Sequence, residues 1–193
     1  MSKENILARC RHNRQKQYDM PALDDIRALT FGHPRAAFVE TSRRMGCNVI
    51  EVKPGQKLDD IIREAYPEAK VIASNLKEVG CATVNPDEEK EPARLNGTDV
   101  GVVRGELGVA ENGCVWVPQS MQNKAVCFIS ENLVIVLAAD SVVSNMHEAY
   151  CRIRMNDYGY GTFISGPSKT ADIAQVLVMG AQAARSVTLV LVP

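Results

Sequence analysis

Residues 163–192 read FISGPSKTADIAQVLVMGAQAARSVTLVLV. A short apolar run leads into a Gly-Pro turn at 166–167, and three polar residues follow it. The spacing of apolar residues predicts a helix over 168–180, and the β-branched run at 187–192 predicts a closing strand. A strand, a polar turn, a helix N-terminus and a further strand form an arrangement that binds anions, because unpaired N–H groups and the helix dipole point at the turn.

The polar residues of this turn have two interpretations. Lys169 and the hydroxyls of Ser168 and Thr170 could bind an anionic ligand at the helix N-terminus. Alternatively, Ser168 or Thr170 caps the helix, with Asp172 favourably placed in its first turn. The candidate ligand-binding residues of this stretch are Gly166, Ser168, Lys169, Thr170 and Asp172.

Length and composition are those of an ordinary globular protein. The chain has 193 residues, of which 46% are hydrophobic and 23% charged, enough for one α/β domain with a sizeable core. A formal net charge of -1 gives no overall field that would attract nucleic acid or an acidic membrane. The sequence shows no secretory signal and no apolar run long enough to cross a bilayer, so we expect a cytoplasmic protein.

The six cysteines are scattered along the chain without a C-x-x-C pair. This spacing predicts neither a disulfide framework nor a zinc or iron–sulfur site. The three histidines lie far apart in sequence, so we expect no metal to be bound by this chain.

Strand and helix patterns alternate along the chain, which predicts an α/β fold with a mainly parallel sheet. Residues 1–33 are predicted to form an N-terminal helical segment and linker, and 34–193 the α/β domain. The expected helices are 2–17, 34–45, 58–66 and 141–153, the last with an Asp140 or Ser141 cap. The expected strands are 47–52, 70–73, 98–103, 125–129 and 133–139, and 85–97 is expected to be a solvated loop.

A second polar motif, Glu111-Asn112-Gly113, lies between two apolar runs, and its three residues are also candidates for binding a ligand. A glutamate on such a turn could act as a general base or as a carboxylate nucleophile. The alternative is a structural role, in which Glu111 caps a neighbouring helix or accepts hydrogen bonds from backbone N–H groups.

Both motifs carry a resemblance to a known family. The segments GVAENGCVWV at 108–117 and FISGPSKTADI at 163–173 resemble the LUD-domain family. The resemblance continues through KENILAR at 3–9, EAYPEAKVIAS at 64–74 and NMHEAY at 145–150. It implies a three-layer α/β sandwich of the type shared by ribose-phosphate isomerases, glucosamine-phosphate deaminases and CoA transferases.

The function that the resemblance implies is an accessory role in L-lactate utilization. Members of the family act in a cytoplasmic system that oxidises L-lactate to pyruvate together with iron–sulfur partner proteins. We expect this chain to bind no cofactor itself, with the iron–sulfur clusters in the partners only. Its own contribution would be to bind a small anionic ligand or a partner protein.

The chain departs from the family at two positions. Gln182 and Asn132 stand where relatives have histidines, so any acid–base work by those histidines is lost here. Both amides keep a hydrogen-bond donor and an acceptor, and we expect them to line a pocket.

Two alternative functions follow from the same comparison. Glu111-Asn112-Gly113 is similar to the motif in which CoA transferases carry their nucleophilic glutamate, which implies an acyl- or CoA-transferase with Glu111 as nucleophile. Related cyclo-ligases suggest folate or nucleotide binding instead. In either case we expect the two motifs to face one pocket at the carboxyl ends of the strands, where open α/β sheets place their sites.

Overall fold

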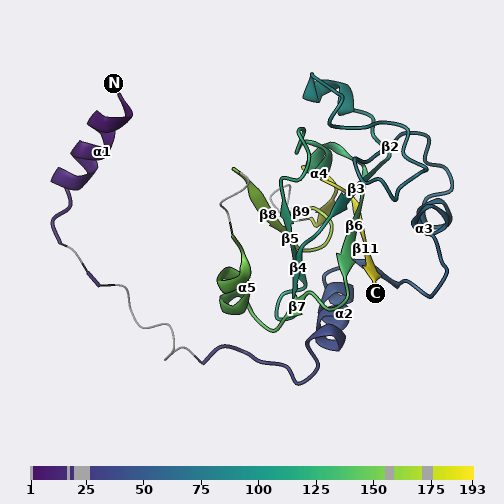
Figure 1. Cartoon of the computed structure of the whole chain (residues 1–193), viewed down its shortest axis with the longest axis horizontal. Helices are drawn as coiled ribbons and strands as arrows, with labels where there is room; N and C mark the ends of the chain where they lie inside the picture. The colour runs from purple at the N-terminus through teal and green to yellow at the C-terminus, as the bar shows by residue number, and fades with distance from the viewer. Residues whose placement is uncertain (1, 17, 20–26, 155–158, 171–175) are drawn as a thin grey trace.

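The computed structural model describes residues 2–16, 18–19, 27–154, 159–170 and 176–193 (Figure 1). Helix α1 (Lys3–His12) begins at Ser2, whose hydroxyl accepts a hydrogen bond from the Asn5 N–H. None of its residues is buried, and Ile6 and Leu7 are 49% and 43% exposed. The short apolar face of α1 is therefore open to solvent.

A parallel sheet of five strands forms the centre of the protein (Figure 1). Its order is β1 (Asn48–Glu51), β11 (Ser186–Val192), β6 (Asn132–Ala138), β3 (Val100–Arg104) and β2 (Ile72–Ala73). Strands β11 and β6 pair over seven residues, and their inner residues are buried. Apolar residues at successive positions suit these two strands because both faces of the sheet are covered.

Different elements cover the two faces of this sheet. Helix α3 (Leu58–Ala65) packs Ile61 and Ile62 on one face. On the other face lie α2 (Pro34–Arg44), which contributes Phe38 and Val39, the short helix α4 (Val126–Ile129), and strands of a second sheet. The predicted α/β class with a mainly parallel central sheet is confirmed.

The second sheet has four strands in the order β7 (Val142–Val143), β4 (Leu107–Val109), β5 (Cys114–Pro118) and β8 (Gly161–Ile164). Helix α5 (Met146–Arg152) packs against it through Ala149 and Met146, in a cluster that includes Trp116 and Phe163. The Trp116 and Phe163 ring centroids are 4.9 Å apart. This sheet matters for function because β8 delivers the chain to the polar turn at 166–167.

Three predicted elements are wrong. Residues 125–129 form α4 rather than a strand, because a short apolar run fits either period. The segment 85–97 contains a 3-10 helix, Pro92–Leu95, whose Leu95 is buried. The helix expected from 141 begins only at Met146, after strand β7, and Asn145 is its N-cap in place of Asp140 or Ser141.

The helix predicted over 168–180 is also wrong: neither of its two ends, which the structure describes, is helical. Strand β9 (Lys169–Thr170) pairs antiparallel with β10 (Val178–Met179). The Gly180 N–H donates to the Ser168 carbonyl at 2.9 Å, which extends the pairing. The middle of the predicted helix lies outside the described residues.

Substitution of Phe38 tests how much the packing between the two sheets contributes to stability. Its side chain is fully buried, and Gly108 of β4 leaves room for its ring. We expect Phe38→Ala to lower the free energy of unfolding by about 3–5 kcal/mol, because a large cavity would remain. Leu29→Ala is the control, since Leu29 is 55% exposed, and should change it by less than about 0.5 kcal/mol. Chemical denaturation measures both, and equal effects would contradict this account of the core.

Candidate functional site

The Gly-Pro turn at 166–167 is fixed by close contact with the end of α2. Gly166 has φ +70°, and a Cβ atom there would lie 2.5 Å from the Met45 carbonyl oxygen. Directly before it, the Ser165 hydroxyl donates to the Asn112 carbonyl at 2.8 Å. Directly after it, the Ser168 N–H donates to the Ala184 carbonyl at 2.8 Å. The turn is thus bonded on both sides and in contact with α2 between them.

Lys169 reaches the C-terminal end of α2. Its ammonium group donates to the carbonyl of Met45, the C-cap residue of that helix. A cation is favourable here because the last carbonyls of a helix carry partial negative charge. An ammonium group has three donors, so one bond to Met45 leaves capacity for a ligand.

Residues around Lys169 line an open groove of about 540 Å³. Its polar wall comprises Thr162, Ser165, Ser168, Lys169 and Gln182. Its apolar floor comprises Cys127, Phe128, Leu133, Phe163, Ile164 and Val187. Among the described residues that line it, Lys169 is the one charged side chain. The groove therefore combines a positive charge and hydrogen-bonding groups with an apolar floor.

The groove lies at the amino ends of the parallel strands, and the expectation of a site at the carboxyl ends is wrong. Leu133 and Val187 are the second residues of β6 and β11, and Met45 precedes β1. The reason is the path of the chain: β8 belongs to the second sheet, and it delivers the turn to the C-terminal end of α2, which runs back toward the start of β1.

Glu111, Asn112 and Gly113 form the turn between β4 and β5, outside the walls of this groove. The Glu111 carboxylate accepts a hydrogen bond from the Met146 N–H at 2.8 Å, at the start of α5. Asn112 accepts from the Cys114 N–H at 3.1 Å. A Cβ on Gly113 (φ +66°) would lie 3.0 Å from the Ser42 backbone of α2. Each of the three residues thus has a contact that holds the turn in place.

The two motifs are adjacent, although only one of them lines the groove. The Ser165–Asn112 hydrogen bond joins them directly, and both touch the last turns of α2. The groove contains Gly166, Ser168, Lys169 and Gln182 of the predicted residues. Thr170 pairs with Val178 in the β9–β10 hairpin and does not line it. Asp172 lies outside the described residues.

Asn132 lines a different cavity from Gln182, so the two amides expected to line a pocket do not share one. The Asn132 cavity, of about 370 Å³, also includes Tyr66 and Arg185. The Ser186 hydroxyl donates to Asn132 Oδ1 at 2.7 Å and lies 3.1 Å from the Tyr66 hydroxyl. Asn132 also donates to the Asp99 carbonyl at 2.9 Å, so its amide is part of a structural hydrogen-bond network.

Cys47 lies beside the polar turn, at the start of β1. Burial raises the pKa of its thiol to about 11, opposed by a hydrogen bond from the Gly166 backbone and by the charge of Lys169. The thiol is therefore neutral at pH 7 and is a poor nucleophile there.

Apart from Gln182, the groove residues outside the two motifs are not among those predicted from the sequence. Phe128 and Cys127 come from a run predicted as a strand, and the pattern around Met45 predicts only the end of a helix. Gly46 is a sequence signal for this end of α2, because a glycine often follows the last helical residue, where the final carbonyls need hydrogen-bond partners. In the structure Gly46 has φ +92°.

Comparison with known proteins identifies the family. The LUD domain family matches residues 86–192, which include every strand from β3 to β11. The chain belongs to the LUD-domain family. No curated protein matches this LUD-domain chain. In the matched region lie both polar motifs, whereas α2 and Met45 lie outside it.

A solved structure shows the same fold. This LUD-domain protein is similar to a DUF162 family protein from Deinococcus radiodurans, with a TM-score of 0.60 and 16% sequence identity. The similarity covers 82% of this chain and 98% of the other. Within the described residues, no helix is both long and apolar enough to cross a membrane. In the same residues, no group of three or more His, Cys, Asp or Glu side chains could hold a metal ion.

Gly166 tests the contact between the turn and α2. We expect Gly166→Ala to lower the free energy of unfolding by about 3 kcal/mol, because the new methyl group adds a clash with the Met45 carbonyl to the strain of positive φ. Gly55→Ala is the matched control, since Gly55 has φ +81° with nothing within 4 Å of a Cβ, and should cost about 1 kcal/mol. Equal losses in urea denaturation would show that the contact with Met45 is unimportant.

Cysteine alkylation tests the environment of Cys47. At pH 8, a thiol with a pKa of about 11 is ionised in about one molecule in a thousand, and Cys47 is also buried. We expect iodoacetamide to modify the exposed Cys10 and Cys151 first and to leave Cys47 intact, as read by peptide mass spectrometry. All six cysteines should react in denaturant. Modification of Cys47 in the folded protein as fast as Cys10 would contradict this description.

Proposed function

We propose that this LUD-domain protein is an accessory component of L-lactate utilization that binds a small carboxylate in the groove beside Lys169. The observation that carries the proposal is the combination of one ammonium group with an apolar floor and no lining carboxylate among the described residues. A carboxylate would be attracted to Lys169, and its short hydrocarbon part would contact the floor.

The polar wall supports recognition of a hydroxyl or carbonyl group next to the carboxylate. The Ser165 and Ser168 hydroxyls and the Gln182 amide lie on this wall and can donate or accept hydrogen bonds. A 2-hydroxy acid such as L-lactate, or its 2-oxo product pyruvate, has both kinds of group. The groove is larger than either acid requires, so longer 2-hydroxy acids are also candidates.

Oxidation itself would take place on iron–sulfur partner proteins in the cytoplasm, with this chain presenting or sensing the acid. The proposal needs no cofactor on this chain. A role without chemistry at the groove agrees with Gln182, because an amide does not exchange protons near pH 7.

The acyl-transfer alternative receives less support from the geometry. A nucleophilic glutamate must face its substrate. The Glu111 carboxylate instead accepts a hydrogen bond from the Met146 N–H, and Glu111 does not line the groove. These contacts favour the structural role for Glu111 that the sequence left open.

Binding measurements test the proposal directly. We expect L-lactate or pyruvate to bind with measurable heat in isothermal titration calorimetry, and Lys169→Met to weaken the binding about tenfold or more, because a charge-assisted hydrogen bond is lost. Lys77→Met, at an exposed lysine outside the groove, is the matched control and should leave binding unchanged. Glycolate and 2-hydroxybutyrate extend the test to acids of other lengths.

A genetic experiment tests the biological role separately. Deletion of the gene in its own organism should slow growth on L-lactate as sole carbon source, and the wild-type gene should restore it better than the gene for Lys169→Met. Unchanged growth of the deletion strain would refute the role in lactate utilization. Growth restored fully by Lys169→Met would refute the role of the groove.

A further inference from the structure

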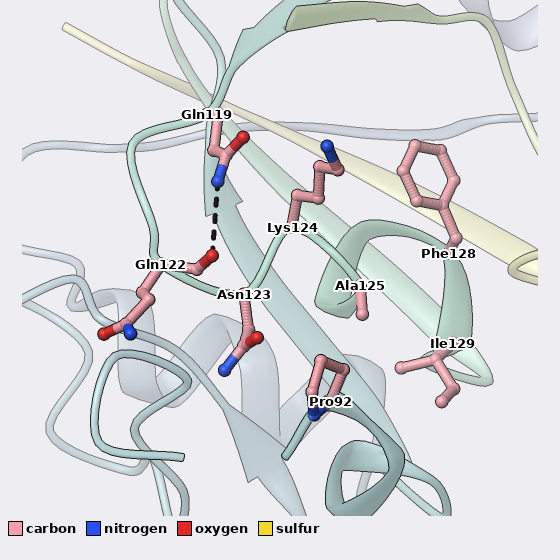
Figure 2. Close-up of a pocket in the computed structure, with 8 residues that line it drawn as sticks. All are labelled: Pro92, Gln119, Gln122, Asn123, Lys124, Ala125, Phe128 and Ile129. Carbon is pink, nitrogen blue, oxygen red and sulfur yellow. Dashed lines mark hydrogen bonds between the residues drawn. The ribbon is translucent and has the colours of Figure 1, made fainter. Parts of the chain in front are cut away.

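A second cavity, of about 600 Å³, lies beside α4 (Figure 2). It is formed by the segment between β5 and α4, by α4 itself and by the 3-10 helix at Pro92–Leu95. The two cavities share one residue, Phe128, which is 37% exposed. Neither polar motif contributes to the second cavity, so the proposed function leaves it unexplained.

One wall of this cavity carries fixed amide groups. Asn123 is 8% exposed, and its side-chain nitrogen donates to the Pro86 carbonyl at 3.0 Å and to the Glu89 carbonyl. Both amide protons are thereby used, and Figure 2 shows the side-chain oxygen on the side of the cavity. Gln119 is oriented by donating to the Gln122 carbonyl at 3.2 Å, which leaves its own oxygen as an acceptor.

The opposite wall is apolar. Figure 2 shows Ala125, Phe128 and Ile129 across from Gln119 and Asn123, and Pro92 beside Asn123. An exposed aromatic ring beside aliphatic groups gives a surface on which a flat ring can stack. A ligand between these walls would need one flat apolar face and hydrogen-bond donors along an edge.

The rim of the cavity carries a positive charge. Lys124 is exposed, and its ammonium group lies 4.2 Å from the centroid of the Tyr160 ring. This contact holds the charge at the rim while leaving its donors available. Among the described residues that line the cavity, Lys124 is the one charged side chain, so an anionic group on the ligand would be attracted to it.

We infer that this cavity binds a nucleoside monophosphate. The base would stack on Phe128 and donate from its edge to the fixed oxygens of Asn123 and Gln119, and the phosphate would contact Lys124. Stacking with a few placed hydrogen bonds is how proteins bind unpaired bases, and a lysine is an ordinary partner for phosphate. The polar groups of this site differ from those of the carboxylate groove, and Phe128 is the residue that the two cavities share.

The experiment is a titration of the full chain with AMP, GMP, CMP and UMP by calorimetry, together with amide chemical-shift mapping. At least one nucleotide should bind saturably, with shifts at Gln119, Asn123, Lys124 and Phe128. The matching nucleoside and ribose 5-phosphate should each bind more weakly than the nucleotide. Lys124→Ala should weaken the nucleotide about tenfold and leave the nucleoside unchanged.

Two control variants test whether the nucleotide binds in this cavity rather than elsewhere on the protein. Lys77→Ala changes an exposed lysine that lines neither cavity, and it should not change nucleotide binding. Lys169→Met should not change it either, whatever that variant does to carboxylate binding. Binding of none of the four nucleotides would overturn the inference, as would ribose 5-phosphate binding as tightly as the nucleotide. Shifts confined to the Lys169 groove would overturn it as well.

Discussion

The arrangement of the site depends on one constraint, the close approach of two turns to the last turns of α2. Gly166 lies so close to the Met45 carbonyl that a Cβ atom has no space, and a Cβ at Gly113 would be in tight contact with the Ser42 backbone at 3.0 Å. The Ser165–Asn112 hydrogen bond then ties the turns to each other. Because both turns belong to the second sheet, these contacts fix that sheet against the parallel one. Lys169 reaches the carbonyl end of α2 as a result, and the groove forms beside it.

The sequence predicted the centre of the parallel sheet well, because β6 and β11 are long apolar runs. Strands β6 and β11 and helices α2 and α3 lie within two residues of their expected positions. Short elements were less predictable. The five residues 125–129 fit a strand or a helical turn equally well, and only their packing beside β3 distinguishes the two. The predicted helix at 168–180 contains the β-branched Val178, and pairing of Val178–Met179 with Lys169–Thr170 outweighed its helical spacing.

The sequence also indicated part of the site, and the reason for its failures is geometric. Gly166, Ser168, Lys169 and Gln182 do line one groove. The position of that groove at the amino ends of the strands depends on the second sheet, whose order and direction have no local signal in the sequence. The apolar floor was missed for the same reason: nothing in the local sequence distinguishes Phe128 and Leu133 from other apolar residues, and only the fold brings them into one groove with Lys169.

The order of strands in the central sheet has a consequence for how this domain can be divided. Strand β1, which lies before the region that matches the LUD domain family, pairs with β11 along one side. A fragment limited to 86–192 would leave the N–H and C=O groups on that side of β11 without their partners. Such an uncovered strand is a template for pairing with another chain, so the fragment would be prone to self-association. The unit that folds as a monomeric sheet must therefore extend beyond the family boundary to include α2 and β1.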